Sequence, residues 1–144
     1  MSTVRSVVAG KSGTVITVRP TDSVLEAARV MNTHKIGSVV VLNKGGEIGG
    51  ILTERDVLTR VVAVARDPRA TLASEVMTTP VFTCAPETPI DTLRDVMKSH
   101  RIRHVPVVDG GRLAAMVSIG DLNAFDAGTL TATVETLEAY ICRA

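Results

Sequence analysis

The segment Ile51-Leu52-Thr53-Glu54-Arg55-Asp56 recurs in the second half of the chain as Met116-Val117-Ser118-Ile119-Gly120-Asp121, 65 residues later (Thr53 to Ser118). Upstream of it, the stretch Val15–Gly46 matches the stretch 66 residues further on (Pro20 to Pro86). Two copies of one unit are therefore present. Because a unit of roughly 50 residues buries little surface alone, we expect the copies to pack face to face, with clefts related by a pseudo-two-fold axis. Such clefts commonly bind small molecules.

The composition is that of a globular protein. The 144 residues are 45% hydrophobic and 22% charged, with a formal net charge of +1. This balance leaves no broad basic face for nucleic acid and no polybasic block for a membrane surface, so neither partner is expected. No apolar run reaches the roughly 18 residues that span a bilayer, which favours a cytoplasmic protein. Cys84 and Cys142 have no metal-ligand spacing, so both are expected to be free thiols.

The order of elements predicted for one copy is strand, helix, strand, strand, helix. In the first copy an extended run at Thr14–Val18 precedes a helix whose apolar stripe starts at Val24. Two strands rich in β-branched residues follow at Val39–Leu42 and Ile48–Leu52, and the tail of the copy is again helical. The second copy repeats this order.

The first residue of that helix is less certain from the pattern. Ser23 and Glu26 have the spacing of a capping box. The repeat alignment nevertheless favours Asp22 as the N-cap, because its counterpart Thr88 is followed by Pro89 at the first helical position.

We divide the chain into repeat 1 with the N-terminal segment (1–64), a connection with one short helical turn (65–80), repeat 2 (81–127) and a C-terminal amphipathic helix (128–144). In the last segment Leu130, Val134, Leu137 and Ile141 form a narrow apolar seam. This helix would cover its own body or pair with a second subunit.

The double occurrence of Thr53-x-x-Asp56 and Ser118-x-x-Asp121 after an apolar pair, with the segment Ile102-Arg103-His104-Val105-Pro106-Val107 opening a strand, resembles the CBS domain family. Two copies in tandem resemble a CBS pair, or Bateman module, over Val15–Ala127. The resemblance implies the α+β fold class, with two sheets packed through the pseudo-dyad. It also implies disc-like dimers, which favours pairing of the C-terminal helix in a homodimer. It also implies regulatory binding of adenosine-containing ligands such as AMP, ADP, ATP, NAD or S-adenosylmethionine.

The paired aspartates are the candidate ribose ligands. Asp56 and Asp121 fall in the first turn of a helix, where a carboxylate can accept hydrogen bonds from both vicinal hydroxyls of a ribose. The hydroxyls of Thr53 and Ser118 lie beside free backbone donors and suit a phosphate oxygen. The alternative is that all four residues only cap their helices.

Arg103 is a candidate phosphate ligand because it shares the strand face of Val105 and Val107, where its guanidinium needs an anion. The resemblance extends phosphate contact to His104. Copy one has Gly37 and Ser38 at the matching positions, so its site would be weaker, would take a less charged ligand, or would be empty. Arg55, whose counterpart is Gly120, would reach a phosphate across the pseudo-dyad or remain an exposed helical residue.

Adenine would be held by apolar walls, and the remaining candidates are hydrophobic residues near the strand ends: Ile16, Val18, Ile36, Phe82, Ile102 and Pro106. Two other patterns fail their context. His100 and His104 are four residues apart but straddle a helix-to-strand junction, and no metal site is expected. The glycines of Gly45–Gly50 join two strands and do not open a helix, unlike a phosphate-binding loop.

The sequence therefore predicts a regulatory sensor of adenine nucleotides, AMP, ADP, ATP or NAD(H), that transmits ligand occupancy to an unidentified protein. No nucleophile, base and orienting group recur together, so catalysis is not expected. The main alternative is a protein-protein interaction module with vestigial clefts.

Overall fold

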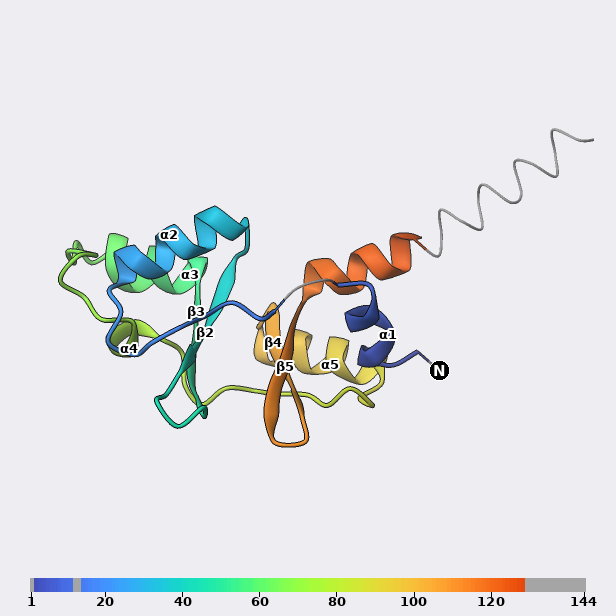
Figure 1. Cartoon of the computed structure of the whole chain (residues 1–144). Coiled ribbons are helices and arrows are strands. Elements are labelled where there is room, and N and C mark those ends of the chain that lie inside the picture. The colour runs from blue at the N-terminus through green and yellow to red at the C-terminus, as the bar shows by residue number, and fades with distance from the viewer. Residues whose placement is uncertain (1, 12–13, 129–144) are drawn as a thin grey trace, which may run out of the picture.

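The computed structural model describes residues 2–11 and 14–128, which form two similar units side by side (Figure 1). The first unit has a sheet in the order β1-β2-β3, from β1 (Thr17–Val18), β2 (Ser38–Leu42) and β3 (Ile48–Thr53). β1 is parallel to β2, and β2 is antiparallel to β3. The second unit has the antiparallel pair β4 (His104–Asp109) and β5 (Arg112–Ser118). The predicted α+β class is confirmed.

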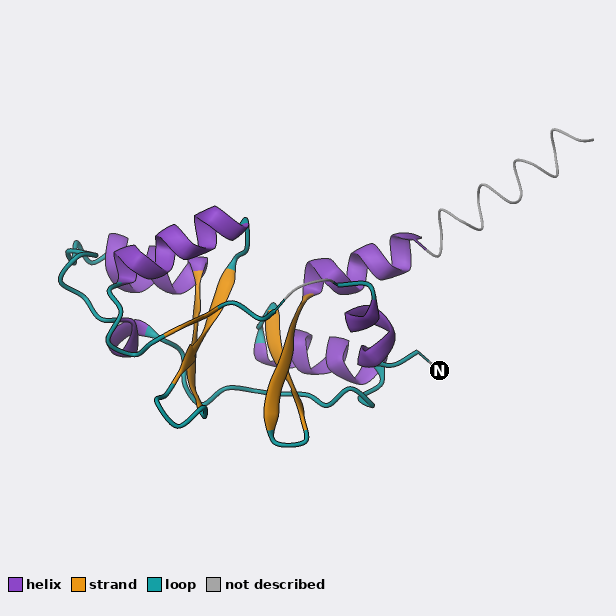
Figure 2. Ribbon diagram, in the orientation of Figure 1, coloured by secondary structure: helices purple, strands orange, loops and turns teal. Residues whose placement is uncertain are grey.

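The parallel pairing at the start of each unit joins equivalent residues. Val18 pairs with Val41 in the first unit, and a single parallel bridge joins Cys84 to Val107 at the equivalent place in the second. The extended run predicted over Thr14–Val18 is a strand only in its last two residues. Figure 2 shows the strands of both units next to one another in the middle of the molecule, with helices flanking them.

The long helices are α2 (Val24–His34) and α5 (Ile90–His100). Each buries three residues at helical spacing and ends at a residue in the left-handed conformation, Lys35 (φ 53°) or Arg101 (φ 54°). The buried residues are Val24, Ala27 and Met31 in α2 and Ile90, Leu93 and Met97 in α5. The apolar stripes predicted from the sequence are thus the faces that pack on the sheets.

The prediction of Asp22 as the N-cap of α2 is wrong. Ser23 is the cap: its hydroxyl accepts from the Glu26 N–H at 3.1 Å, and the Glu26 side chain accepts from the Ser23 N–H. Asp22 instead accepts from the backbone N–H of Arg19 at 2.8 Å and binds its guanidinium. The repeat alignment misled here because Pro89, which lacks a capping side chain, occupies the N-cap position of α5.

The tail of the first unit starts as α3 (Glu54–Val57) and continues as a π-helical turn, η1 (Leu58–Val62). In the second unit a helix covers residues 119–128. The C-terminal helix predicted from residue 128 lies, from residue 129 on, outside the described residues. Over the described ranges, no helix is both long enough and apolar enough to cross a membrane.

Two short helices cross between the units. The first, α1 (Val4–Ala9), precedes the first unit in sequence but buries Val4 and Val7 in the core of the second. The other, α4 (Ala73–Val76), precedes the second unit but packs in the core of the first. We call residues 2–11 and 71–78 the crossing segments.

Several backbone bonds of one crossing segment have a counterpart in the other. The Val4 N–H donates to the Thr88 carbonyl at 2.9 Å, as the Ala73 N–H donates to Asp22 at 2.8 Å. The carbonyl of Ser2 accepts from Ile90, as that of Thr71 accepts from Val24. Each unit is therefore completed by a piece of chain that the sequence attaches to the other.

Candidate functional site

A cavity of about 690 Å³ lies between the two units. The first unit and the chain before it contribute residues around β1 and the turn after α2. The second unit contributes the middle of β5 and the start of the helix at 119–128. The lining residues are Val8, Lys11, Thr14, Val15, Ile16, His34, Lys35, Ile36, Gly37, Ser38, His104, Ala114, Ala115, Met116, Ser118 and Asp121.

Ser118 and Asp121 are fixed by a reciprocal capping box. The Asp121 N–H donates to the Ser118 hydroxyl at 3.0 Å, and the Ser118 N–H donates to Oδ2 of Asp121 at 2.8 Å. Because β5 ends at Ser118, the box holds the carboxylate at the cavity wall, where a helix starts. Within the described chain, Oδ1 of Asp121 has no hydrogen-bond donor. The residue therefore caps its helix and still offers one oxygen to a ligand.

Lys11, at the end of the first crossing segment, binds the same carboxylate. Its ammonium donates to Oδ2 of Asp121 at 2.8 Å and to the Met116 carbonyl at 2.6 Å. Burial raises the pKa of Asp121, but the Lys11 ammonium and the hydrogen bonds from Ser118 outweigh it, so the pKa lies below its usual value. Asp121 is thus an anion in the neutral range.

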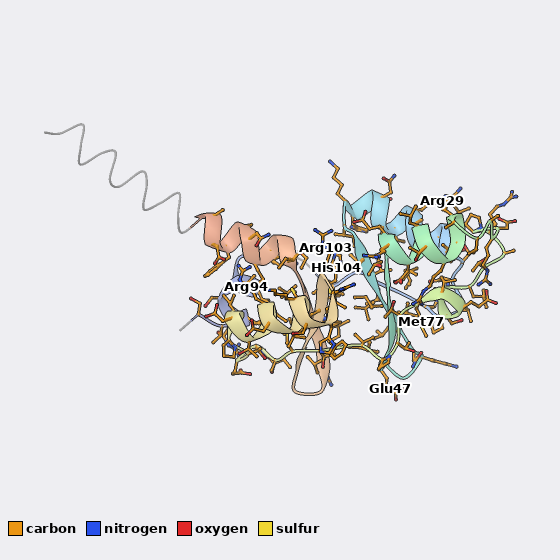
Figure 3. The ribbon with its side chains drawn as sticks, turned by 180° about the vertical axis from the view of Figure 1, so that it is seen from behind. Arg29, Glu47, Met77, Arg94, Arg103 and His104 are labelled. Atoms are coloured by element: carbon orange, nitrogen blue, oxygen red, sulfur yellow. The ribbon has the colours of Figure 1, made fainter. Side chains whose placement is uncertain are left out.

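His104 stands at the start of β4 on the same wall, and Figure 3 places it with Arg103 at the seam between the units. Burial lowers the pKa of His104 below 6.5, although the carboxylates of Glu54 and Asp121 oppose this. The imidazole is therefore mostly neutral at pH 7. A neutral imidazole offers a ligand one N–H donor and one nitrogen acceptor.

The equivalent carboxylate of the first unit, Asp56, is not accessible from the large cavity. Asp56 forms the same capping box with Thr53, at 3.0 and 3.1 Å. Its Oδ1, however, accepts from the hydroxyl of Thr78 in the second crossing segment at 2.9 Å, and the residue is only 7% exposed. The neighbouring Met77 packs over Gly50, so close that a Cβ on Gly50 would lie 2.5 Å from its sulfur. The cavity does not reach Asp56.

A smaller cavity of about 470 Å³ adjoins the first one beside α2 and α3. The two share Lys35, Ile36 and Gly37. Because Gly37 has no side chain, the Glu54 carboxylate can lie against it; a Cβ at position 37 would be only 2.6 Å from Oε1 of Glu54. In the first unit the large cavity is lined by the run before β1 and the turn after α2, and Thr53 and Asp56 are not in its lining.

The structure brings together about half of the candidates from the sequence. Those that line the large cavity are Ile16, Ile36, Gly37, Ser38, His104, Ser118 and Asp121. The candidates outside its lining are Val18, Thr53, Arg55, Asp56, Phe82, Ile102, Arg103 and Pro106.

Several of these outlying residues have structural roles instead. Val18 is in the core of the first unit, and Phe82 stacks on His100 with ring centroids 4.1 Å apart. The carbonyl of Pro106 accepts from Cys84 in the sheet. His100 ends α5 and His104 opens β4, and the described residues contain no group of three potential metal ligands.

Lys11 and Met116 were not among the site candidates from the sequence. Met116 belongs to the apolar pair before Ser118-x-x-Asp121, but Lys11 belongs to no motif and reaches the site only because α1 packs on the second unit. No pattern within one repeat could have found it.

The CBS domain sequence profile matches residues 5–63 and 73–128. The chain is 37% identical over 108 residues to the CBS domain-containing protein YhcV of Bacillus subtilis, covering 75% of this chain and 76% of YhcV. It is 36% identical over 122 residues to the uncharacterized protein MK0525 of Methanopyrus kandleri, covering 84% of this chain and 62% of MK0525. The chain thus spans less than two thirds of that relative.

Solved structures agree. The CBS-domain containing protein ATU1752 from Agrobacterium tumefaciens has a TM-score of 0.82 at 38% identity, over 87% of this chain and 99% of that one. The CBS domain pair of protein MJ0100, solved with 5′-methylthioadenosine and S-adenosyl-L-methionine, has a TM-score of 0.76 at 27% identity, over 89% and 98%. Fold and site define a regulatory module built from a repeat pair. The chain belongs to the CBS domain family and carries two CBS domains.

Proposed function

We propose that this CBS pair is a sensor of adenine nucleotides, AMP, ADP, ATP or NAD(H), and that a ligand in the large cavity reports its presence to a partner protein. The observation that carries the proposal is Asp121, a carboxylate fixed in the cavity wall with Oδ1 open to a ligand. The cavity volume lies in the range of about 300 to 1,000 Å³ typical of small-molecule sites. The methylthioadenosine and S-adenosylmethionine in the MJ0100 structure support an adenosine-containing ligand here.

The residues suggest how such a ligand would be held. A ribose hydroxyl would donate to Asp121, and the Ser118 hydroxyl and the N–H of His104 would donate to phosphate oxygens. Ile16 and Ile36 would pack on the base. Because the ligand would contact both units, binding would change the free energy of their relative arrangement. Such coupling is typically worth about 1 to 3 kcal/mol.

Only the second-unit aspartate is open, so we expect one nucleotide per chain. The experiment is calorimetric titration with AMP, ATP, NAD, NADH and S-adenosylmethionine on the wild type, on Asp121→Asn and on the matched variant Asp56→Asn. We expect binding to be lost or weakened at least tenfold in Asp121→Asn and kept in Asp56→Asn. The ligand should be recovered chemically unchanged, as a sensor requires.

Two results would contradict the proposal. Equal weakening by both variants would mean that the open carboxylate does not hold the ligand. Absence of binding by all five ligands, in protein free of co-purified nucleotide, would favour the interaction module with vestigial clefts.

We also propose a homodimer as the working form. Leu58, Val62 and Val64 are 60%, 63% and 59% exposed in the first unit, and a second copy would remove this apolar surface from water.

A further inference from the structure

The ammonium of Lys11 occupies a position that a nucleoside needs. Oδ2 of Asp121 already accepts from the Ser118 N–H and from Lys11, both at 2.8 Å. A carboxylate oxygen has two lone pairs, so Oδ2 has no acceptor capacity left. A ribose that engages both carboxylate oxygens with its two hydroxyls must therefore displace Lys11.

The second crossing segment has no equivalent of Lys11, and Asp56 forms its ion pair with Arg60 of the first unit, with Nε 3.9 Å from Oδ1. There the crossing segment brings the uncharged hydroxyl of Thr78 to Asp56, whereas here it brings a cation that is 40% exposed in its side chain. Lys11 lines the cavity, and one of its three N–H groups makes no hydrogen bond within the described chain. Asp121 is the single acid among the described lining residues. A displaced Lys11 therefore finds no second carboxylate in this wall.

We propose that Lys11 is the specificity-determining residue of the cavity, which selects phosphorylated over unphosphorylated nucleosides by exchanging Asp121 for an anionic oxygen of the ligand. The inference rests on the proposed function and names its ligand class. A nucleotide replaces the lost ion pair with a phosphate contact to the same ammonium. Adenosine breaks the pair and offers no anion in return, so the cavity discriminates against it.

The test compares the dissociation constants of AMP and adenosine for the wild type, Lys11→Met, Lys11→Arg and the control Lys44→Met, which lies in the exposed β2–β3 turn. In the wild type and the control, AMP should bind at least tenfold more tightly than adenosine. In Lys11→Met, AMP should weaken while adenosine stays equal or tightens, so that the preference falls toward one. Lys11→Arg keeps the charge and should retain most of the preference. The thermal midpoint of each variant verifies its folding.

Each of the other outcomes would refute a different part of the proposal. If the wild type binds AMP and Lys11→Met keeps the wild-type preference over adenosine, the role of Lys11 is refuted and the sensor stands. If both ligands tighten equally in Lys11→Met, Lys11 only blocks the site and confers no selectivity. If the wild type binds neither AMP nor adenosine nor NAD, the proposed function and this inference fall together.

Discussion

Asp56 and Asp121 form the same capping box with the same kinds of donor, and yet only Asp121 lines the cavity. The difference comes from the crossing segments, which bring Thr78 to one carboxylate and Lys11 to the other. The repeated motif is thus a buried cap beside one crossing segment and part of a cavity wall beside the other. The capping and ligand-binding interpretations of the motif are compatible at Asp121, because the cap uses only Oδ2.

The ion pair at Asp121 predicts a pH dependence of stability. The pKa of this carboxyl is lowered in the folded state from an ordinary value of 3.8. Its ionised form therefore stabilises the fold above that value, and this contribution is lost as the pH falls through the folded-state pKa. We expect Asp121→Asn to lower the thermal midpoint at about pH 7 and to have a smaller effect at about pH 3.

The control for this prediction is Glu47→Gln in the exposed β2–β3 turn, which should shift the midpoint by a similar small amount at both pH values. A midpoint difference for Asp121→Asn that stays constant between the two would show that ionisation of this carboxyl does not contribute.

At the scale of elements, the repeat pattern did not predict which unit α1 and α4 pack on. α1 has six residues; Val4 and Val7 are buried in the core of the second unit, and Val8 packs against it. The first crossing segment makes two backbone bonds to the chain that opens α5, and the second makes the equivalent two to the chain that opens α2. We infer that a crossing helix is as much a part of the unit it covers as α2 or α5.

We expect Val4→Ala to destabilise the protein by about 2 kcal/mol, because Val4 is fully buried and the change leaves a cavity in the core of the second unit. Chemical denaturation measures the difference. Ser6→Ala, at an exposed residue of the same helix, is the matched control and should stay within about 0.5 kcal/mol of the wild type. Equal effects of the two substitutions would show that α1 is not part of the core.

Much of the fold could be predicted from residues. Apolar spacing located α2 and α5, and the β-branched runs located β2 to β5. The duplicated motif predicted that the chain forms two similar units. The cap of α2 was misassigned because alignment to Pro89 outweighed local hydrogen bonding at Ser23. The asymmetry of the site could not be predicted, since Thr78 and Lys11 act on carboxylates far away in sequence, and only the packing of the crossing helices brings them there.

At the scale of the whole molecule, the apolar surface is as asymmetric as the site. Leu58 and Val62 of the first unit are exposed, and the residues 65 positions later, Asn123 and Ala127, offer no such face (Leu58 to Asn123). A homodimer formed through this surface would use the first unit of each chain.

Light scattering tests the dimer. We expect a mass near twice the chain mass of 15.2 kDa, and we expect the double variant Leu58→Asp/Val62→Asp to reduce it toward the monomer. The matched double variant Asn123→Asp/Ala127→Asp in the second unit should leave the dimer intact. A monomeric wild type would refute the homodimer, and disruption by both double variants would place the interface elsewhere.

The crossing segments also mean that the boundary between the repeats in sequence is not their boundary in space. Cutting the chain near residue 65 would leave the first half with α1 but without the helix that closes its own core, and the second half with α4 but without α1. Each fragment would present a bare apolar side together with a spare helix that fits the other fragment. We therefore expect each half to fold poorly alone and the two halves to associate and fold together when they are mixed.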